Sequence, residues 1–326
     1  MKMRLGVIGL GGAGLKHCRS AASLPTIELV ATADPNTPAE LVLPAATRRY
    51  DDWRRIIDDP RVQAISVCVP HHLHAEIAIA AMQAGKHVLL EKPIASNLEQ
   101  AEQVVLAAQN TDVVLMVEMT HRFYPPLIEA RQFIAGGRLG RILAAEDRII
   151  EPGAEHLPAW MLRSETAGGG VALTNGVHML DRVAWMCGEP LRLHCGRVSR
   201  NQQLGDVEDT AMMHLSLAGD ATPVSVLASW VRRGTHLDDE LTIYATGGTL
   251  RVWAWHGWRF EPRDGAHEEY ETYPATDSLD DRVAVGMRAA LAAFADAIVT
   301  EAESPVPVED ALSAQRLIHQ LYQASR

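Results

Sequence analysis

The chain has 326 residues, of which 47% are hydrophobic and 22% charged, and its formal net charge at pH 7 is −11. This length predicts two domains, and the composition is that of an ordinary globular protein. The acidic balance argues against a nucleic-acid or anionic-membrane partner, and we expect no apolar stretch long enough to span a bilayer.

The four cysteines show no C-x-x-C spacing. Cys18 and Cys68 fall in apolar surroundings, which predicts reduced, buried thiols. A glycine-rich turn interrupts the first apolar run before it reaches signal-peptide length. We therefore expect a cytoplasmic protein.

A first strand is predicted over residues 3–8 and a helix over 15–24. Between them, the sequence matches G-x-G-x-x-G. Such glycines permit a tight turn, close approach of a pyrophosphate and close helix–strand packing, and the helix N-terminus supplies amide donors. The pattern predicts a dinucleotide-binding turn formed by Gly9, Leu10, Gly11, Gly12, Ala13 and Gly14.

A second strand over residues 27–33 ends in Asp34, twenty residues past Gly14. A carboxylate at this place accepts hydrogen bonds from the adenosine ribose and repels a 2′-phosphate. No arginine follows in Pro35-Asn36-Thr37, so NAD is favoured over NADP. The alternative is a turn aspartate before a proline.

Residues 35–47 show little helical periodicity, a short helix is predicted over 51–57, and a buried strand over 64–69 precedes Pro70-His71-His72-Leu73-His74. The three histidines lack a fourth ligand at a suitable spacing, so we predict no metal site there. We expect Pro70, His71 and His74 to line a cofactor cleft instead.

The apolar run Val88–Leu90 reads as a buried strand that ends in Glu91-Lys92-Pro93. Ligands of open parallel sheets bind beyond the carboxyl ends of the strands, where Lys92 falls. A partly desolvated lysine amine can lose its proton near neutral pH and act as a base. The alternative is a surface lysine. Glu91 is expected beside the cofactor, and the Lys92–Pro93 bond is a candidate cis peptide.

A helix from Asn97 to Ala108 and a strand over 113–117 complete an alternation of strands and helices up to Glu118. This alternation predicts a doubly wound parallel sheet, that is, a Rossmann domain over residues 1–120. Residues 121–326 form the predicted second domain, α+β in class, whose C-terminal helices could pack back on the first.

In the second domain, a helix carrying Leu127, Ile128, Phe133 and Ile134 precedes strand-like alternation. The pattern is clear around residues 211–217, 224–230, 241–245 and 250–252, with a hairpin at Gly247-Gly248. It predicts a mostly antiparallel sheet with one covered face. Trp253, Trp255 and Trp258 are interpreted as packing or subunit-interface residues rather than a sugar-stacking platform. Two amphipathic helices end the chain.

Gly168-Gly169-Gly170 leads into a helix over 171–181 that ends before Gly188. Thr174 and His178 lie one turn apart on one face of this helix. The triple glycine lets the backbone approach another group closely, and we expect that group to be the nicotinamide end of a cofactor. Gly176 inside the helix indicates tight packing around His178, for which a buried structural histidine is the alternative.

Taken together, these motifs resemble the glucose–fructose oxidoreductase, inositol dehydrogenase and MocA (Gfo/Idh/MocA) oxidoreductases along essentially the whole chain. The resemblance rests on Gly9–Gly14, Asp34, Pro70 with His74, Ala84–Val88 running into Glu91-Lys92-Pro93, Arg122-Phe123, Gly168–Gly170 with His178 and Asp181, and Val207–Thr210. It implies NAD(P)-linked oxidation of a hydroxyl on a sugar, cyclitol or similar polyol. It also implies Lys92 as the proton-transfer residue, His178 as its partner, and a homodimer or homotetramer formed through the open face of the C-terminal sheet.

Thr174 departs from the pattern, because many members of this family carry an aspartate there. Threonine brings no charge, so a neutral Lys92 becomes easier to reach, but a group that could relay a proton is lost. We expect a substrate different from that of the inositol enzymes. Two other functions stay open, a non-catalytic NAD-bound sensor or scaffold and an NAD-assisted glycosidase. Weaker candidates for substrate contact are Arg122, His156, Trp160 and Arg163.

Overall fold

A computed structural model describes residues 2–36, 42–152, 157–202, 205–232, 237–263, 265, 268–271, 273 and 277–325. The chain divides into two compact units. The first comprises Met1–Met119 with Met287–Leu312, and the second comprises Thr120–Gly286 with Ser313–Arg326. The first unit therefore includes a late segment that the sequence had placed in the second domain.

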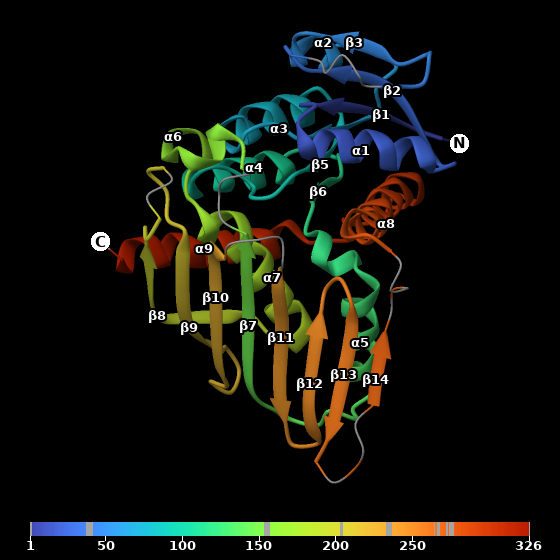
Figure 1. Ribbon diagram of the computed structural model, residues 1–326. Coiled ribbons are helices and arrows are strands. Elements are labelled where there is room, and N and C mark those ends of the chain that lie inside the picture. The colour runs from blue at the N-terminus through green and yellow to red at the C-terminus, as the bar shows by residue number, and fades with distance from the viewer. Residues whose placement is uncertain are drawn as a thin grey trace. The chain divides into compact units, whose positions relative to one another are not determined.

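The first unit contains the predicted doubly wound parallel sheet (Figure 1). All of its strand pairs are parallel. In spatial order its strands are β3 (Arg48–Tyr50), β2 (Ile27–Ala33), β1 (Met3–Ile8), β4 (Ala64–Val67), β5 (His87–Leu90) and β6 (Leu115–Val117). This is the order of a dinucleotide-binding sheet, in which the direction of winding reverses between β1 and β4. The short strand β3 escaped prediction because its residues carry no apolar alternation.

The helices of this unit are α1 (Gly12–Ser23), α2 (Trp53–Ile57), α3 (His74–Gln83), α4 (Leu98–Gln109) and most of α8 (Leu279–Thr300). Helix α1 begins three residues before the predicted start, because the end of the glycine-rich turn is already helical. Asn97 caps α4, as its side-chain oxygen accepts a hydrogen bond from the Gln100 amide at 2.9 Å. Asp52 caps α2 in the same way.

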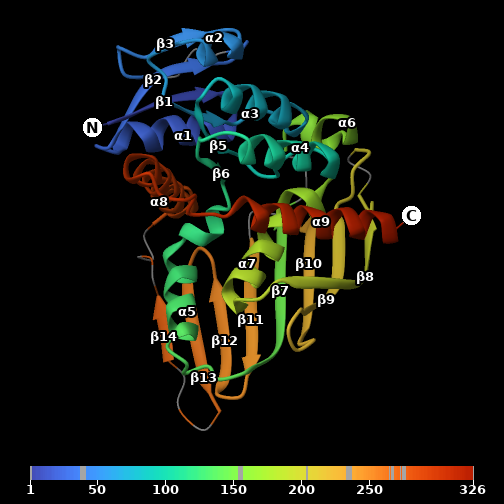
Figure 2. The same cartoon turned by 180° about the vertical axis from the view of Figure 1, so that it is seen from behind.

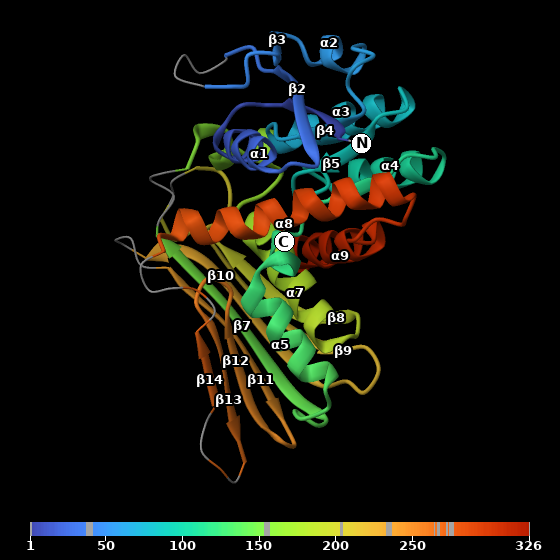
Figure 3. The ribbon, with the colours of Figure 1, turned by 90° about the vertical axis from the view of Figure 1, so that its right-hand side faces the viewer.

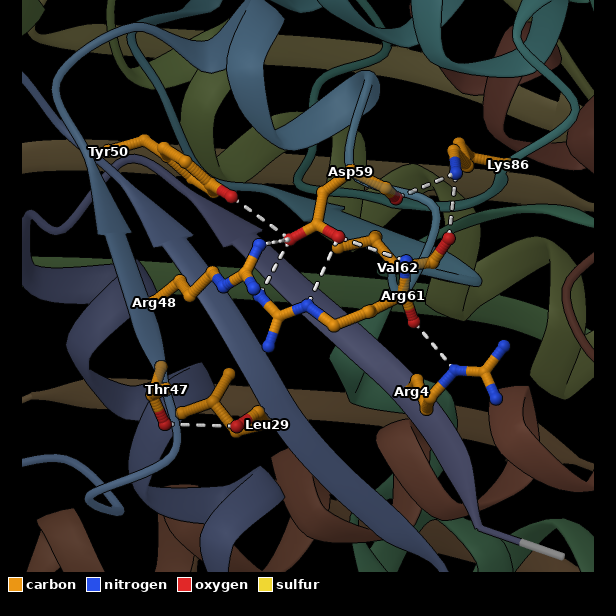
Figure 4. A network of polar contacts seen from close by, with 9 residues as sticks. All are labelled: Arg4, Leu29, Thr47, Arg48, Tyr50, Asp59, Arg61, Val62 and Lys86. Atoms are coloured by element: carbon orange, nitrogen blue, oxygen red, sulfur yellow. Dashed lines mark hydrogen bonds and ion pairs between the residues drawn. The ribbon is translucent and has the colours of Figure 1, made fainter.

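A buried carboxylate fixes the loop between α2 and β4 (Figure 4). The Asp59 side chain accepts hydrogen bonds from the Tyr50 hydroxyl at 3.0 Å and from the Arg61 guanidinium at 2.7 Å. The Lys86 amine donates to the carbonyl oxygens of Asp59 and Val62. The Arg61 hydrogen bonds hold the pKa of Asp59 well below its usual range.

Helix α8 corrects one expectation from the sequence. By length and composition alone it could cross a membrane, since it has 22 residues and an 18-residue window of mean hydropathy 1.6, of which 44% is buried. A core helix passes the same test, and the buried side of α8 carries the apolar residues Met287, Leu291, Phe294 and Ile298.

The second unit contains the predicted mostly antiparallel sheet, in which only the β7–β10 pair is parallel among the described residues. In spatial order its strands are β14 (Glu268–Glu271), β13 (Gly257–Pro262), β12 (Gly248–Trp253), β11 (Asp238–Ala245), β7 (Ile142–Pro152), β10 (Pro223–Arg232), β9 (Thr210–Leu217) and β8 (Leu191–Ser199). Its helices are α5 (Pro125–Ala135), α6 (Ser164–Ala167), α7 (Val177–Cys187) and most of α9 (Val308–Ala324).

One face of this sheet is covered, as predicted. Figure 2 shows α5, α7 and α9 over that face, and the view in Figure 3 places them on the same side. Within the described part of the chain no helix covers the other face, where polar pairs such as Tyr244 with Glu146 and Arg251 with Glu240 lie. The hydrophobic core of this unit therefore lies between the sheet and the three helices.

The tryptophans confirm the packing interpretation for two of the three positions. Trp255 and Trp258 are buried in this core, and the Trp258 ring stacks on Tyr270 at 4.1 Å between ring centroids. Trp253 lies half-buried, and its indole N–H donates to Glu240 at 3.1 Å.

Candidate active site

The glycines of the first turn divide into two kinds. Gly9 has φ +87°, and a Cβ at Gly9 would overlap the backbone of Cys68, whereas a Cβ at Gly14 would overlap the carbonyl oxygen of Gly9. A Cβ at Gly11 or Gly12 would meet no atom within 4 Å. The fold itself thus requires Gly9 and Gly14, but it gives no reason for the glycine at position 11. The predicted close approach of a pyrophosphate would supply that reason.

Asp34 follows β2, as predicted, and it also fastens the glycine turn. Its Oδ2 accepts a hydrogen bond from the Leu10 amide at 2.6 Å, and its Oδ1 accepts one from the Asn36 amide at 2.7 Å. Each carboxylate oxygen has two lone pairs, so both retain capacity for ribose hydroxyls. Binding of a ribose by Asp34 stays a prediction.

His74 joins the chain segments that follow β4 and β5. Its side chain is fully buried, with Nδ1 at 2.7 Å from the Pro93 carbonyl oxygen and Nε2 at 2.9 Å from that of Val69. Burial lowers the pKa of His74. The buried ring of His71 lies 5.4 Å from that of His74, and Pro70 precedes both at the start of a short 3₁₀ turn, His71–Leu73. Contact of Pro70, His71 and His74 with a cofactor stays a prediction.

Glu91 and Lys92 directly follow β5, at the carboxyl edge of the parallel sheet. The Glu91 amide continues the strand pairing by donating to the Val67 carbonyl oxygen at 3.1 Å. Both side chains are only partly exposed, and the Lys92–Pro93 bond is cis, as predicted. The lysine therefore stands where open parallel sheets bind their ligands.

Beneath this edge lies a buried polar cluster that the sequence did not reveal, formed by His17, Glu91 and Glu118. The His17 Nε2 atom lies 2.7 Å from Glu118 Oε2 and 3.3 Å from Glu91 Oε1. Its Nδ1 atom lies 2.7 Å from the Ser66 hydroxyl. The side chains of His17 and Glu118 are fully buried, and that of Glu91 is 15% exposed. The only sequence signal was a histidine on the apolar side of a helix, which is common without function.

The members of the cluster perturb one another. Burial alone would lower the pKa of His17, but contact with Cys68 and with the Glu118 carboxylate raises it well above its usual value. Burial raises the pKa of Glu118. Burial also opposes ionisation of Glu91. The neighbouring His17 and Lys92 nevertheless hold the pKa of the Glu91 carboxyl below its usual range. At neutral pH we therefore assign a charged imidazolium beside an ionised Glu91.

In the second unit, His178 lies at the start of α7, directly after one turn of π-helix, Ala172–Gly176. Such turns are frequent at functional sites. The imidazole is 8% exposed and stacks on that of His121, with ring centroids 4.5 Å apart and planes 12° from parallel. The ring of Trp255 meets His121 edge-on at 5.9 Å. Thr174 is buried in the π turn.

The group that approaches the triple glycine belongs to the protein, which accounts for these glycines without a cofactor. A Cβ at Gly170 would overlap the backbone of Glu208, and a Cβ at Gly169 would overlap the Tyr322 hydroxyl. The Glu208 Oε1 atom accepts hydrogen bonds from the amides of Gly170 and Ala172 and from the Tyr322 hydroxyl, at 2.8–3.0 Å. This carboxylate caps the start of the helix that carries His178.

The weaker substrate-contact candidates are scattered. Arg122 is buried and forms a two-pronged ion pair with Asp181 on α7, at 2.9 and 2.6 Å, which accounts for its position. Trp160 is half-buried and Arg163 is exposed. His156 lies outside the described residues. Substrate contact by any of them stays a prediction.

The three histidines at positions 71, 72 and 74 do not gather into a metal-binding group within the described residues. The group of metal-ligand type found there is His17, Glu91 and Glu118, whose ligand atoms lie within 4.8 Å of one another. Within this group, His17 Nε2 and Glu118 Oε2 lie at an ion-pair distance of 2.7 Å.

Models of known families match both parts of the chain. Residues 3–119 match the model described as "Oxidoreductase family, NAD-binding Rossmann fold", and residues 127–251 match the model of the GFO/IDH/MocA C-terminal domain. A levoglucosan dehydrogenase from Pseudarthrobacter phenanthrenivorans is 33% identical over 208 residues, which is 57% of this chain and 52% of that relative. The match to the first relative thus spans about half of its length.

A myo-inositol 2-dehydrogenase from Thermotoga maritima is 25% identical over 255 residues, covering 76% of this chain and 74% of the relative. Among solved structures, a levoglucosan dehydrogenase in complex with NADH and levoglucosan superimposes with a TM-score of 0.87. That match covers 100% of this chain and 97% of the other at 23% identity, and it shows a shared fold.

Proposed function

Because the chain belongs to the Gfo/Idh/MocA oxidoreductase family, we propose that it is an NAD-dependent dehydrogenase that acts on a hydroxyl of a sugar, cyclitol or related polyol. The observation that carries the proposal is the position of Lys92. It stands directly after β5, at the carboxyl edge of a sheet whose glycine turn has an open backbone at Gly11 and Gly12.

The residues of the turn suit NAD. The backbone of Gly11, Gly12 and Ala13 at the start of α1 would hold the pyrophosphate, and Asp34 would hold the adenosine ribose. Asp34 is followed by Pro35 and Asn36, so no positive side chain at these two positions invites a 2′-phosphate. We therefore propose NAD rather than NADP.

Oxidation of an alcohol removes a hydride from carbon and a proton from oxygen. When bound, NAD⁺ supplies the hydride acceptor. We assign the proton to the neutral amine of Lys92, which becomes an ammonium and returns the proton in the reverse reaction. The chain has only four lysines among its 30 basic residues. A lysine can lose its proton near neutral pH when its surroundings favour this, whereas an arginine stays charged, which fits a lysine kept here for chemistry.

His178 is proposed to position the substrate hydroxyl and to share its proton. Its stacking on His121 and the capping of its helix by Glu208 fix the ring in place. Thr174 adds a hydroxyl but no charge, and for this reason we propose a substrate other than that of the inositol enzymes.

The test is NADH formation, followed by absorbance, across a panel of sugars, sugar acids and cyclitols. With a substrate found, Lys92→Ala should lower kcat by about 10²–10⁴-fold while NADH still binds. Lys2→Ala, at an exposed lysine, is the control and should leave kcat unchanged. Full activity of Lys92→Ala would refute the assignment. Tight NADH binding without turnover of any substrate would favour a sensor or scaffold, and aglycone release without net NADH would favour the glycosidase.

A double-mutant cycle tests whether Lys92 and His178 serve one reaction. Groups that act on the same proton give strongly non-additive losses. The variant that combines Lys92→Ala with His178→Gln should therefore be hardly slower than Lys92→Ala alone. Independent, multiplying losses would separate the two roles.

We further propose a homodimer or homotetramer formed through the open face of the second unit's sheet, and a cytoplasmic location. The helix-free face and the four free thiols support these two proposals. Light scattering of the purified protein measures the first.

A further inference from the structure

We propose that the buried cluster of His17, Glu91 and Glu118 sets the charge state of the Lys92 amine, so that these residues tune the proposed base without touching the substrate. The inference rests on the proposed function for its purpose, because a tuned amine matters only if Lys92 transfers protons. Its physical content concerns the first unit alone.

The geometry makes His17 the centre of the cluster. Three secondary-structure elements bring charge to it: α1 supplies the imidazole, the end of β5 supplies Glu91, and the end of β6 supplies Glu118. The Ser66 hydroxyl, on β4, fixes Nδ1, so that Nε2 faces both carboxylates, at 2.7 and 3.3 Å. One imidazole nitrogen thus lies beside two carboxylates.

Burying these charged groups costs the fold stability, which indicates that the cluster serves another purpose. His17 and Glu118 are fully buried, and burying ions costs several kcal/mol each before pairing. A well-packed apolar group at position 17 would serve the fold of α1 as well or better. Glu91 is joined to Lys92 by one peptide bond. The charge of Lys92 acts to lower the pKa of both Glu91 and Glu118.

Two further titratable groups of this unit lie near the cluster, Cys68 beside His17 and His74 near Glu91. Burial raises the pKa of the Cys68 thiol, so it stays neutral at physiological pH. Burial lowers the pKa of His74, whose two ring nitrogens lie 2.7 and 2.9 Å from carbonyl oxygens. The carboxylate of Glu91 thus places the charge of the cluster beside Lys92 in the chain.

The sign of the effect follows from charge. An anion stabilises the ammonium form of Lys92 and a cation destabilises it. Neutralising Glu91 should make the amine easier to deprotonate. Neutralising His17 leaves the carboxylates uncompensated and should make the amine harder to deprotonate.

The small number of lysines allows a direct test on the protein without substrate or NAD. The four lysines are labelled by reductive ¹³C-methylation, and the Lys92 resonance is identified by its loss in Lys92→Arg. The pH midpoint of that resonance should fall by about one unit in Glu91→Gln and rise by about one unit in His17→Gln. Glutamine at position 17 keeps an N–H for Glu118 without the charge. If His17→Gln does not fold, Glu91→Gln alone decides.

The matched control is Glu76→Gln, an exposed carboxylate on α3 that pairs with Arg54. It should leave the Lys92 midpoint unchanged. A neighbouring charge is expected to move the Lys92 midpoint by roughly one pH unit. Midpoints within about 0.3 unit of wild type in both cluster variants would overturn the proposal. So would a rise in the melting temperature of the unliganded wild type on adding Zn²⁺ that is absent in His17→Gln, since that would make the cluster a cation site.

Kinetics supply a second readout. With a substrate in hand, the acidic limb of the kcat/KM profile for alcohol oxidation should move to lower pH in Glu91→Gln and to higher pH in His17→Gln, whereas a purely structural role would change only the height of the profile. Full activity of Lys92→Ala would refute the proposed function but leave the NMR result standing. The two failures are therefore distinguishable.

Discussion

Gly11→Ala separates what the fold requires from what a ligand requires. Gly11 has φ −71° and ψ −167°, which any residue can adopt, and an added Cβ meets no protein atom within 4 Å. Alanine should therefore leave stability unchanged or raise it by about 0.4–1 kcal/mol, through a less flexible unfolded chain. If a pyrophosphate contacts this backbone, the same methyl overpacks that contact at a cost of about 1–3 kcal/mol.

That cost corresponds to a loss of NADH affinity of roughly 5- to 140-fold. The assay is NADH fluorescence titration beside urea unfolding of the same samples. Gly136→Ala is the control, because Gly136, at the end of α5, also has a φ that any residue adopts, −69°, and an added Cβ there makes only ordinary contacts; its affinity should stay near that of wild type. Unchanged affinity in Gly11→Ala, or a loss of stability that accounts for its weaker binding, would refute this reasoning.

Three further predictions concern stability. Gly170→Ala should destabilise the protein by about 3 kcal/mol or more in urea unfolding, because its Cβ would overlap the Glu208 backbone, and a neutral result would contradict the close packing described here. Asp59→Asn should cost about 2 kcal/mol at pH 7 through its lost charged hydrogen bonds. Because the pKa of Asp59 is lowered in the folded state, its contribution is present above the unfolded pKa near 3.9 and is lost as pH falls through the folded pKa, so the gap between wild type and variant should narrow towards pH 3. The pKa of His17 is raised in the folded state, so its positive charge stabilises the fold fully below about pH 6.5. This stabilisation is lost as pH rises through the folded pKa. The free energy of unfolding, measured from pH 6 to 9, should therefore fall less in His17→Gln than in wild type.

The pattern of the sequence predicted what depends on local chemistry. Apolar runs bounded by glycine and proline located β1, β2, β4 and β5, and period-two alternation located β9 to β12. The strand β3 and the edge strand β8 lack a continuous apolar pattern, so nothing local distinguished them from loops. The expectation that no apolar stretch is long enough to span a bilayer failed at α8, because alanine-rich core helices and membrane spans share length and hydropathy.

Site residues that depend on long-range contacts were harder to find. By contrast, the glycine turn, Asp34 and Lys92 can each be recognised from a short stretch of sequence. The cluster of His17, Glu91 and Glu118 spans 101 positions in sequence and exists only when three elements converge. The triple glycine was interpreted as space for a cofactor because its real neighbours, Glu208 and Tyr322, come from remote segments.

In the proposed reaction, the amine of Lys92 must be able to lose its proton. The most direct measurement is the single-turnover rate of NADH formation in Lys92→Arg, since arginine keeps a positive charge but cannot act as a base near neutral pH. NADH binding should stay close to that of wild type, and hydride transfer should slow by at least about 100-fold. A Lys92→Arg enzyme that turns over at the wild-type rate would contradict it.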